Sequence, residues 1–428
     1  MRATFKYLLF IILLYAVKPV CAQQVDLDYF INNAIKNDPG IKQNVNQQQI
    51  YGLQSQLINA QNKAPQVNFT SDYKFDPFFA SDGKPIAITS NPSTDAFGYD
   101  AALTNGGLYA TQLNVAISLL NKKVIKVLQD QNTNMGAINA SSRKQLEHDL
   151  RKNVTDLYIQ VYQAQQQEEY LQLVIQQVRD RKATVEALVK RGLLQQSDYL
   201  LLEIEQNSRE TDLSTARITE AIAYGALKNA TLVTDTALTK LKEPVLNLQA
   251  KPGTFYYKDK FKLDSLNLVI QQNVFNIKYL PTLAFNGSTG MMTSDFTNIP
   301  HNVGLEAWLH LNIPIYDGRQ RKINDAQSKI TQQGIIYARD NFTMQQKNYL
   351  ANIQKQISLY NQNMELIKKL IEKQDLLLQL DKHKLENGQL SIIEYIKSIS
   401  DYVAAKQSLT VAKVQVLSLA NQYNYYNW

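Results

Sequence analysis

The sequence is poor in cysteine: its one cysteine, Cys21, lies in an N-terminal segment with the composition of an export signal. This segment combines a basic start at Arg2 and Lys6, an apolar stretch over residues 7–17 and a small-residue cleavage site, Val20-Cys21-Ala22. We expect residues 1–22 to be a signal peptide, so that the chain from Gln23 onward has no disulfide, zinc-thiolate site or cysteine nucleophile. Lipidation of Cys21 stays an open alternative, although the residues before it are a poor sequence for lipoprotein processing.

Long apolar runs and strongly charged runs are also missing. The apolar stretch of the signal is shorter than the roughly 20 residues that a spanning helix needs, and no later window of that length is free of charges. We therefore expect no transmembrane helix. Loss of the signal, with its three cations, lowers the formal net charge from +7 to +4, and no Lys/Arg-rich run occurs. Nucleic acid is therefore excluded as an expected partner.

No catalytic or metal-binding motif is found. The four histidines are far apart and have no carboxylate or histidine at a metal-ligand spacing: His148, His301, His310 and His383. The sequence has no phosphate loop, nucleophile elbow or dinucleotide fingerprint. Glu147-His148-Asp149 is interpreted as a group of solvated side chains on an exposed helix. We therefore expect neither an enzyme nor a cofactor or metal site.

The sequence does contain an internal repeat. Three landmarks occur twice in the same order: APQVNF (64–69) and LPTLAF (280–285), LNVAI (113–117) and LNIPI (311–315), GLLQQSDY (192–199) and GQLSIIEY (388–395). The second and third pairs are separated by 198 and 196 residues. Because these offsets nearly agree, we interpret residues 23–230 and 258–428 as two structural repeats, joined by a mixed connector over residues 231–257.

Each repeat is predicted to run helix, strand, loop, strand, very long helix, turn and helix. Glycine and proline are few, 16 and 11, and gather at the ends of these segments, as expected for long elements. In the first repeat the expected strands are 67–76 and 110–119, followed by a long helix over 120–190 and a helix over 195–230. In the second repeat the strands are 282–291 and 303–316, and the helices are 318–387 and 391–425. The predicted fold class is mainly α with a membrane β part.

All four expected strands alternate apolar and polar residues, and the fourth does so over the whole range 303–316. Strands of about 10 residues with aromatic residues toward one end suit a membrane barrel, although a sandwich would alternate as well. Four strands cannot close such a barrel, and an open edge in lipid would leave backbone groups unpaired. We therefore expect an oligomer that shares one barrel, with about eight strands from two copies or about twelve from three.

The long helices carry apolar residues at alternating steps of three and four, which is the coiled-coil period. Two such runs are Leu150, Val154, Leu157 and Val161, and Leu350, Ile353, Ile357 and Tyr360. At about 1.5 Å per residue, a helix of roughly seventy residues would extend on the order of 100 Å, so we expect it to project into an aqueous space. The faces rich in Gln and Asn are interpreted either as ordinary solvated surface or as the lining of a water-filled duct.

Two sets of residues are candidate functional sites. The first set surrounds the two glycine turns that join antiparallel helices: Arg191, Gly192, Asp198, Tyr199, Gly388, Glu394, Tyr395 and Lys397. The glycines suit the left-handed conformation that ends a helix, and the two carboxylates lie near helix N-termini. These carboxylates are interpreted either as simple caps or as a ring of charge at a channel mouth that attracts cations. The second set is the strand-to-helix corner, Pro314, Tyr316, Asp317 and Gly318, where proline and glycine tolerate a sharp change of direction.

Three segments resemble a known family, the TolC-like outer-membrane efflux and secretion channels. LNIPIYDGRQRK (311–322) is similar to the strand-to-helix signature of the family, and KRGLLQQSDYLLLE (190–203) and ENGQLSIIEYIKS (386–398) are similar to its paired tips. The duplicated layout extends the resemblance over essentially all of residues 23–428. One departure lies in the second tip, where the family often has two acidic residues three positions apart, whereas Glu394 is followed here by Lys397. The resemblance then implies a constriction of mixed charge.

The resemblance implies a homotrimer in the outer membrane of a Gram-negative bacterium. A shared twelve-stranded β-barrel would be continued by a long α-helical barrel across the periplasm. The protein would conduct substrates passively as part of a tripartite efflux pump or a type I secretion system. Its tips would dock a periplasmic adaptor protein that is joined to an inner-membrane pump.

Two other classes of protein are compatible with parts of the sequence. A trimeric coiled-coil fibre or adhesin of the cell surface would explain the heptads and the absence of catalytic motifs, but it has no need of four alternating strands. A periplasmic adaptor would contain one long helical hairpin, whereas two are expected here. Drugs, metal cations and secreted proteins all stay open as cargo.

Overall fold

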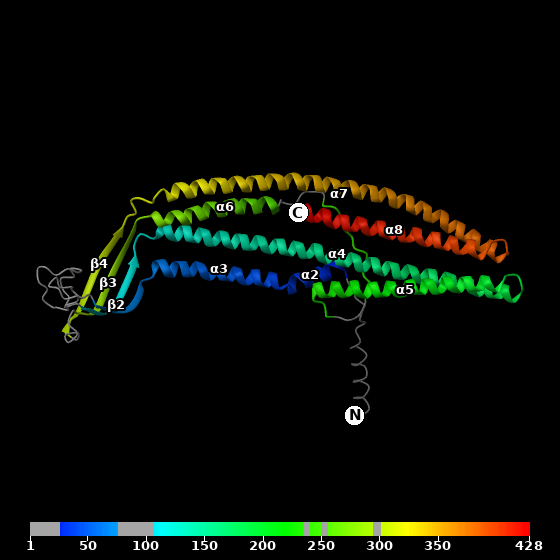
Figure 1. Cartoon of the computed structure of the whole chain (residues 1–428), viewed down its shortest axis with the longest axis horizontal. Coiled ribbons are helices and arrows are strands. Elements are labelled where there is room, and N and C mark those ends of the chain that lie inside the picture. The colour runs from blue at the N-terminus through cyan, green and yellow to red at the C-terminus, as the bar shows by residue number, and fades with distance from the viewer. Residues whose placement is uncertain (1–25, 76–106, 235–238, 250–255, 294–300) are drawn as a thin grey trace, which may run out of the picture. The chain divides into compact units, whose positions relative to one another are not determined.

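The computed structural model describes residues 26–75, 107–234, 239–249, 256–293 and 301–428 (Figure 1). The chain forms two compact units, which are described separately. Unit 1 contains residues 1–44, 142–257 and 340–428, and unit 2 contains residues 45–141 and 258–339. Each unit therefore takes segments from both sequence repeats. The expected signal peptide lies outside the described residues.

Unit 2 contains an antiparallel sheet of four strands: β1 (Gln66–Phe75), β2 (Gly107–Ser118), β3 (Thr282–Thr293) and β4 (Val303–Asn312). The strands lie in the order β1-β2-β3-β4, so the sheet joins the two repeats through the β2–β3 pair. β1 and β4 are its two edge strands, and among the described residues each has one side without a partner strand. Figure 1 labels β2, β3 and β4 of this sheet.

The register divides the strand residues between two faces of the sheet. Most of the large exposed apolar side chains share one face: Val67, Phe69, Tyr73, Leu113, Phe285, Val303, Leu305, Leu309 and Leu311. The charged residues and the histidine of the described strands all lie on the other face, namely Asp72, Lys74, Glu306 and His310, together with exposed Met292 and Trp308. Because side chains alternate along a strand, the sheet has one apolar face and one largely polar face.

The fourth strand is shorter than the sequence predicted. Alternation continues to Tyr316, but β4 ends at Asn312, so the predicted end was wrong by four residues. Asn312 pairs with Thr282, the first residue of β3, and the chain before Thr282 is no longer a strand. A strand also loses a ladder hydrogen bond at proline, which is residue 314 here. The alternating sequence therefore continues beyond the point where β3 can pair with it.

Helices flank the sheet in unit 2. α3 (Pro39–Lys63) precedes β1, and α6 (Tyr256–Asn276) with the short η1 (Ile277–Tyr279) precedes β3. The first turns of α4 (Lys122–Lys190) and α7 (Gln320–Glu386) follow β2 and β4. Polar side chains join them in pairs: Ser55 Oγ donates to Gln129 Oε1 at 2.8 Å, and Gln272 Nε2 donates to Asp325 Oδ1 at 2.8 Å.

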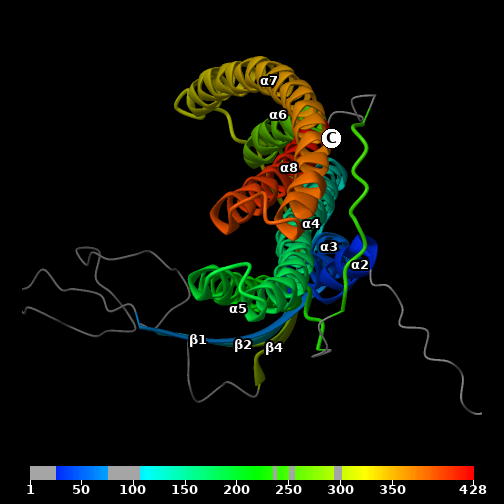
Figure 2. The ribbon, with the colours of Figure 1, turned by 90° about the vertical axis from the view of Figure 1, so that its right-hand side faces the viewer.

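Unit 1 is helical and contains two hairpins. α4 turns into α5 (Gln196–Thr231), α7 turns into α8 (Ile392–Tyr426), and α2 (Leu27–Asn37) packs against α5. Figures 1 and 2 both show α4 beside α5 and α7 beside α8. One apolar core contains buried residues of all four hairpin helices, including Val178, Leu202, Leu385 and Ile399. The two hairpins of one chain therefore share a core.

The connector between the repeats is partly described, over residues 231–234 and 239–249. After the end of α5 these residues form neither helix nor strand, and side chains of unit 1 bind their backbone instead. The Tyr158 hydroxyl donates to the Lys242 carbonyl at 2.6 Å. Gln165 bridges two points, because its Nε2 donates to the Thr239 carbonyl at 3.0 Å and its Oε1 accepts from Leu241 N at 2.8 Å. These hydrogen bonds hold residues 239–249, which we call the strap, against α4.

The predicted fold class is confirmed in its coarse form, a mainly helical chain with four antiparallel strands. The long helices α4 and α7 have 69 and 67 residues. Within the described part of the chain, no helix has the length and apolar character needed to cross a membrane.

Candidate functional site

The two glycine turns of unit 1 have the same backbone geometry. Gly192 and Gly388 have φ values of +73° and +68°, the left-handed region that the sequence predicted for them. At the first turn, Leu193 N donates to Leu188 O at 2.9 Å and Gly192 N to Val189 O at 2.9 Å. The second turn repeats both bonds, from residue 389 to 384 and from 388 to 385. Each long helix therefore ends in a Schellman motif with glycine at the left-handed position.

The two carboxylates of the candidate site cap the helices that follow these turns. Gln195 N donates to Asp198 Oδ2 at 2.9 Å at the start of α5. At the start of α8, Ser391 N and Ser391 Oγ donate to Glu394 Oε2 at 3.3 and 3.1 Å, and Glu394 N donates to Ser391 Oγ at 3.2 Å. This reciprocal pair is a capping box, and a negative charge there also favours the helix dipole. In one chain, both carboxylates therefore have a structural role as caps.

Polar contacts join the two tips within the chain. Arg181 Nη1 of α4 lies 3.2 Å from Glu386 Oε1 of α7, and Arg209 Nη2 of α5 donates to Ser400 Oγ of α8 at 3.3 Å. Tyr395 is only 3% exposed and belongs to the shared apolar core. Burial raises the pKa of its phenol, and the nearby Arg181 guanidinium opposes that rise. Tyr395 is thus an internal anchor of the tips.

The remaining tip residues lie on the surface or at its edge. Tyr199 packs partly buried against the shared core, with the Lys182 ammonium 5.1 Å from its ring centre. Arg191 and Lys397 are exposed, as are Gly192, Gly388 and Glu394. Sequence reasoning missed two exposed apolar side chains beside them, Leu193 at 65% and Ile393 at 66%. Each tip therefore presents a large aliphatic side chain close to a cation.

The strand-to-helix corner belongs to unit 2 and has a left-handed backbone. Gly318 and Arg319 have φ values of +62° and +66°. Asp317 stabilises this turn, because its Oδ1 accepts from Arg319 N at 3.0 Å and its Oδ2 accepts from Arg321 Nε at 2.7 Å. The hydrogen bond from Arg321 lowers the pKa of the Asp317 carboxyl. Pro314 is half-buried and Tyr316 is 79% exposed.

The corresponding corner of the first repeat differs. Among the described residues none between β2 and α4 has a positive φ, so this corner turns without a left-handed residue. Asn121 supports it instead: its Nδ2 donates to the carbonyls of Asn62 and Ser118, and its own carbonyl accepts from Ile125 N. The two repeats therefore reach the same strand-to-helix connection with different backbone geometry.

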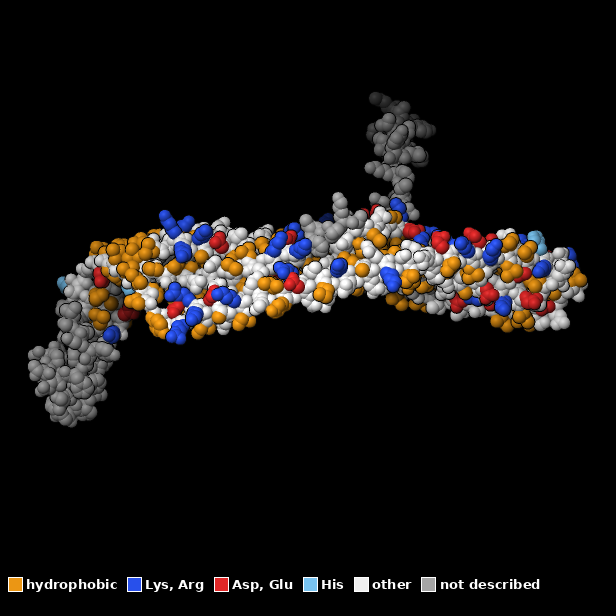
Figure 3. All heavy atoms as spheres, turned by 90° about the horizontal axis from the view of Figure 1, so that it is seen from above, with side chains coloured by type: hydrophobic (Ala, Val, Ile, Leu, Met, Phe, Trp, Pro, Cys, Tyr) orange, Lys and Arg blue, Asp and Glu red, His pale blue; other side chains and the backbone are white. Residues whose placement is uncertain are grey.

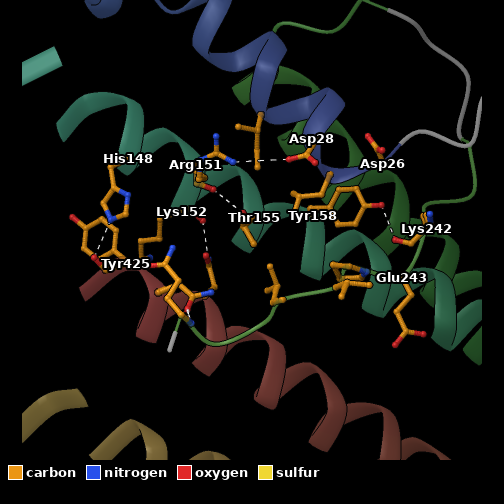
Figure 4. Close-up of a pocket in the computed structure, with 18 residues that line it drawn as sticks. Asp26, Asp28, His148, Arg151, Lys152, Thr155, Tyr158, Lys242, Glu243 and Tyr425 are labelled. Carbon is orange, nitrogen blue, oxygen red and sulfur yellow. Dashed lines mark hydrogen bonds and ion pairs between the residues drawn. The ribbon is translucent and has the colours of Figure 1, made fainter. Parts of the chain in front are cut away.

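A pocket of about 320 Å³ in unit 1 lies between α2, α4, the strap and α8 (Figure 4). His148 lines it and is stacked between aromatic rings, with ring centres 3.9 Å from Trp428 and 4.8 Å from Tyr425. His148 Nε2 also lies 2.9 Å from the Tyr425 carbonyl oxygen. The interpretation of His148 as a solvated side chain was therefore wrong, because residues near the end of α8 cover it. Burial lowers the pKa of its imidazole.

The charged side chains that line this pocket balance one another. Its lining contains three carboxylates, Asp26, Asp28 and Glu243, and three cations, Arg151, Lys152 and Lys242. Figure 4 shows the Arg151–Asp28 ion pair, in which the nearest atoms are 3.9 Å apart. Within the described residues, no group of three or more His, Cys, Asp or Glu side chains could hold a metal ion.

Comparison with known proteins supports the fold. No protein-family model matches the chain, and no curated protein matches it in sequence. Solved structures do match: a membrane protein from Pseudomonas aeruginosa has 13% sequence identity and a TM-score of 0.71, over 94% of this chain and 90% of that chain. The CmeC outer membrane channel of Campylobacter jejuni has 12% identity and a TM-score of 0.68, over 93% and 85%. The open-state MtrE outer membrane channel of Neisseria gonorrhoeae has 13% identity and a TM-score of 0.68, over 96% and 93%.

These matches cover nearly the whole chain, with both hairpins and the sheet. The chain therefore has the fold of the TolC-like outer-membrane channels, which confirms the resemblance stated from the sequence.

Proposed function

We propose that this protein is an outer-membrane channel that conducts substrates passively out of the periplasm of a Gram-negative bacterium. Three copies share one barrel of about twelve strands, four from each copy, and the helices continue the conduit into the periplasm. The observation that carries this proposal is the sheet of unit 2. It has one exposed apolar face, its charged residues lie on the other face, and neither edge has a partner strand in the part of the chain that the structure describes.

The sheet cannot remain open in a lipid bilayer, because each unpaired backbone group there costs several kcal/mol. Pairing β1 of one copy with β4 of the next removes both edges when the ring closes. The apolar face then meets lipid and the polar face lines the interior, as in known membrane barrels. The similar fold of the CmeC and MtrE outer membrane channels supports the same arrangement.

Unit 1 supports an oligomer independently. α5 exposes Leu200, Ile204, Ile218 and Ile222, and α7 exposes Leu359, Leu366, Leu370, Leu377 and Leu380, with exposed fractions between 46% and 69%. Their spacing follows the coiled-coil period, yet no helix among the described residues covers them. Helices of neighbouring copies would bury these two seams and form the wall of a tunnel.

The tips are proposed as the contact site for a periplasmic adaptor protein of an efflux pump or type I secretion system, joined to an inner-membrane pump. The exposed Leu193 and Ile393 provide apolar contacts, and Arg191 and Lys397 favour a partner surface with acidic groups. Glu394 and Lys397 of three copies would place both signs of charge at the mouth, so we expect weak ion selectivity there.

The first experiment measures the assembly and the pore in one sample. The detergent-purified protein is weighed by light scattering or native mass spectrometry and then added to a planar bilayer. Discrete conductance steps from a trimer are the expected result. A trimer that never conducts and leaves membranes without detergent would favour the coiled-coil fibre instead.

Engineered disulfides test the shared barrel directly, because the mature chain is expected to have no cysteine of its own. A double variant carries one cysteine in β1, at Thr70, and one in β4, at Gly304, Glu306 or Trp308. Three strand spacings of about 4.8 Å separate β1 from β4 within one sheet, which exceeds the reach of a disulfide. Crosslinked trimers therefore require two copies to meet at their edges. The single-cysteine variants are the controls, and crosslinks that grow beyond trimers would contradict a closed ring.

A further inference from the structure

The four connections between strands and helices meet at one end of the sheet in unit 2. β1 and β3 begin there and β2 and β4 end there, as the pairs Gln66 with Ala116, Ser118 with Ala284 and Thr282 with Asn312 show. The segments that make this end are residues 63–65, 119–126, 278–281 and 313–322. They are called the rim below.

The rim is strongly basic although the mature chain is nearly neutral. The start of α4 contributes Lys122, Lys123 and Lys126, and the corner and start of α7 contribute Arg319, Arg321 and Lys322. Lys63 and Lys278 complete the set, while Asp317 is the one acid of the four segments. Eight cations against one carboxylate give the rim a net charge of +7, compared with +4 for the whole chain after residue 22.

The rim cations have few anionic partners of their own. All eight side chains are exposed, and in the part of the chain that the structure describes only Arg321 forms an ion pair, with Asp317 at 2.7 Å. The charge is therefore available to an external anion. On the face drawn in Figure 3, groups of Lys and Arg side chains lie close to hydrophobic side chains.

The surroundings of the rim are those of a membrane surface. The exposed apolar face of the sheet ends here, and beyond β4 the chain exposes Ile315 at 94% and Tyr316 at 79%. The guanidinium of Arg321 lies over the ring of Tyr279, with its Cζ 5.1 Å from the ring centre. Aromatic side chains and long cationic side chains that extend toward the headgroups are typical of the boundary between lipid tails and water.

We propose that the rim binds the phosphate groups of anionic phospholipids in the periplasmic leaflet of the outer membrane. The inference rests on the proposed function, because it requires the sheet to lie in a bilayer. Phosphate headgroups are negatively charged and therefore complement the positively charged rim. They lie at the depth of the bilayer where the apolar face of the sheet would end. A patch of this net charge would enrich anionic lipid around the barrel and fix its depth in the membrane.

The test measures lipid selectivity in reconstituted vesicles. The protein is placed in phosphatidylcholine vesicles, and electron spin resonance of spin-labelled lipids gives the association of phosphatidylglycerol relative to phosphatidylcholine. We expect at least a threefold preference for phosphatidylglycerol at low salt. Raising the salt to 1 M should remove most of that preference, because the Debye length falls to about 3 Å.

A variant with reduced charge locates the site. Changing Lys122, Lys123, Lys126 and Lys322 to Gln lowers the net charge of the rim from +7 to +3 and should clearly reduce the association ratio. The matched control changes four exposed lysines of α7 in unit 1, Lys355, Lys369, Lys373 and Lys384, which form no ion pair in the described structure. This control should keep the wild-type ratio. If the fourfold rim variant does not fold, the pairs Lys122/Lys123 and Lys126/Lys322 are tested separately.

The outcomes separate this inference from the proposed function. Conductance in neutral phosphatidylcholine bilayers reports the channel, and we expect it from the wild type and both variants. A wild type that conducts but has no preference for phosphatidylglycerol overturns the lipid site alone, as does a preference that is as large in the rim variant as in the wild type. A protein that neither conducts nor inserts overturns both proposals.

Discussion

Glu394 has two roles that a pair of substitutions can separate. Its carboxylate caps α8 through Ser391, and in the proposed trimer three copies of it lie at the mouth of the tunnel. Glu394→Gln keeps an acceptor oxygen at the same position of the capping box but removes the charge. Glu394→Ala removes both. The first variant therefore reports the charge, and the difference between the two reports the cap.

The expected magnitudes follow from the contacts. In Glu394→Ala the two donors of Ser391 lose their acceptor, whereas the bond from the backbone N of residue 394 to Ser391 Oγ is kept; a lost hydrogen bond costs about 0.5–1.5 kcal/mol. In Glu394→Gln the hydrogen bonds persist and only the attraction to the helix dipole is lost, about 0.3–1 kcal/mol at an exposed site. Glu394→Ala should therefore be the less stable variant in each copy.

Two assays read these effects independently. Thermal unfolding followed by circular dichroism gives the order of stability, wild type above Gln above Ala. The reversal potential in a potassium chloride gradient gives the ion selectivity, which should shift toward chloride by the same amount in both variants, because both leave Lys397 without its acidic neighbour. Equal stability of the two variants would refute the capping account. An unchanged reversal potential would refute the position of Glu394 at the mouth.

Three further predictions concern the backbone and the half-buried His148. Gly290→Ala should destabilise the folded protein by about 1–3 kcal/mol, the range for overpacking, because a Cβ there would lie 2.2 Å from a β2 carbonyl oxygen. Gly287→Ala is the control, because its Cβ would meet nothing closer than 3.7 Å. The stability of both variants is measured by the temperature at which the folded band disappears in gel electrophoresis. Arg319→Gly and Leu232→Gly should each raise the free energy of unfolding by about 1 kcal/mol in denaturant titrations, because both residues hold a left-handed backbone at φ values of 66° and 54°; lower stability would show that their side chains matter more than the strain. The pKa of His148 is lowered in the folded state, so the unfolded chain binds a proton at higher pH and the stability of the fold should decrease as the pH drops below about 6.5. His148→Gln should weaken this pH dependence in melting curves between about pH 5 and 8. An unchanged dependence would exclude His148 as its source.

Much of the architecture could be predicted because it depends on periodic patterns. The alternation over residues 67–76 and 282–291 predicted β1 and β3 nearly to the residue, and the glycines at 192 and 388 predicted the two turns. These signals are local, since the side-chain period and the left-handed preference of glycine do not depend on distant residues. The predicted end of β4 was wrong because the end of a strand is not a local property: it depends on where the partner strand begins.

The contacts of the connector and of His148 could not be predicted in this way. Tyr158 holds the strap through one hydrogen bond to its backbone and Gln165 through two, and the sequence pattern of α4 gives no sign of them. His148 is covered by Tyr425 and Trp428, which lie more than 270 residues further along the chain. The His148 contacts join the two repeats, and the strap contacts join the first repeat to the connector. Neither set has a period, so a pattern followed along the chain assigns these residues to the surface.

A coiled-coil fibre would account for unit 1 but not for unit 2. The exposed seams of α5 and α7 in unit 1 would suit a fibre as well as a tunnel, because both bury apolar stripes between copies. The sheet of unit 2 does not suit a fibre. A sheet exposed to water on one face buries its apolar face against a core, whereas this one leaves Phe69, Leu305 and Leu309 exposed by 64–84%. Closure into a ring covers the edges but not this face, so only an apolar surrounding completes the burial. The channel therefore accounts for both units with a single assembly, and the fibre accounts for one.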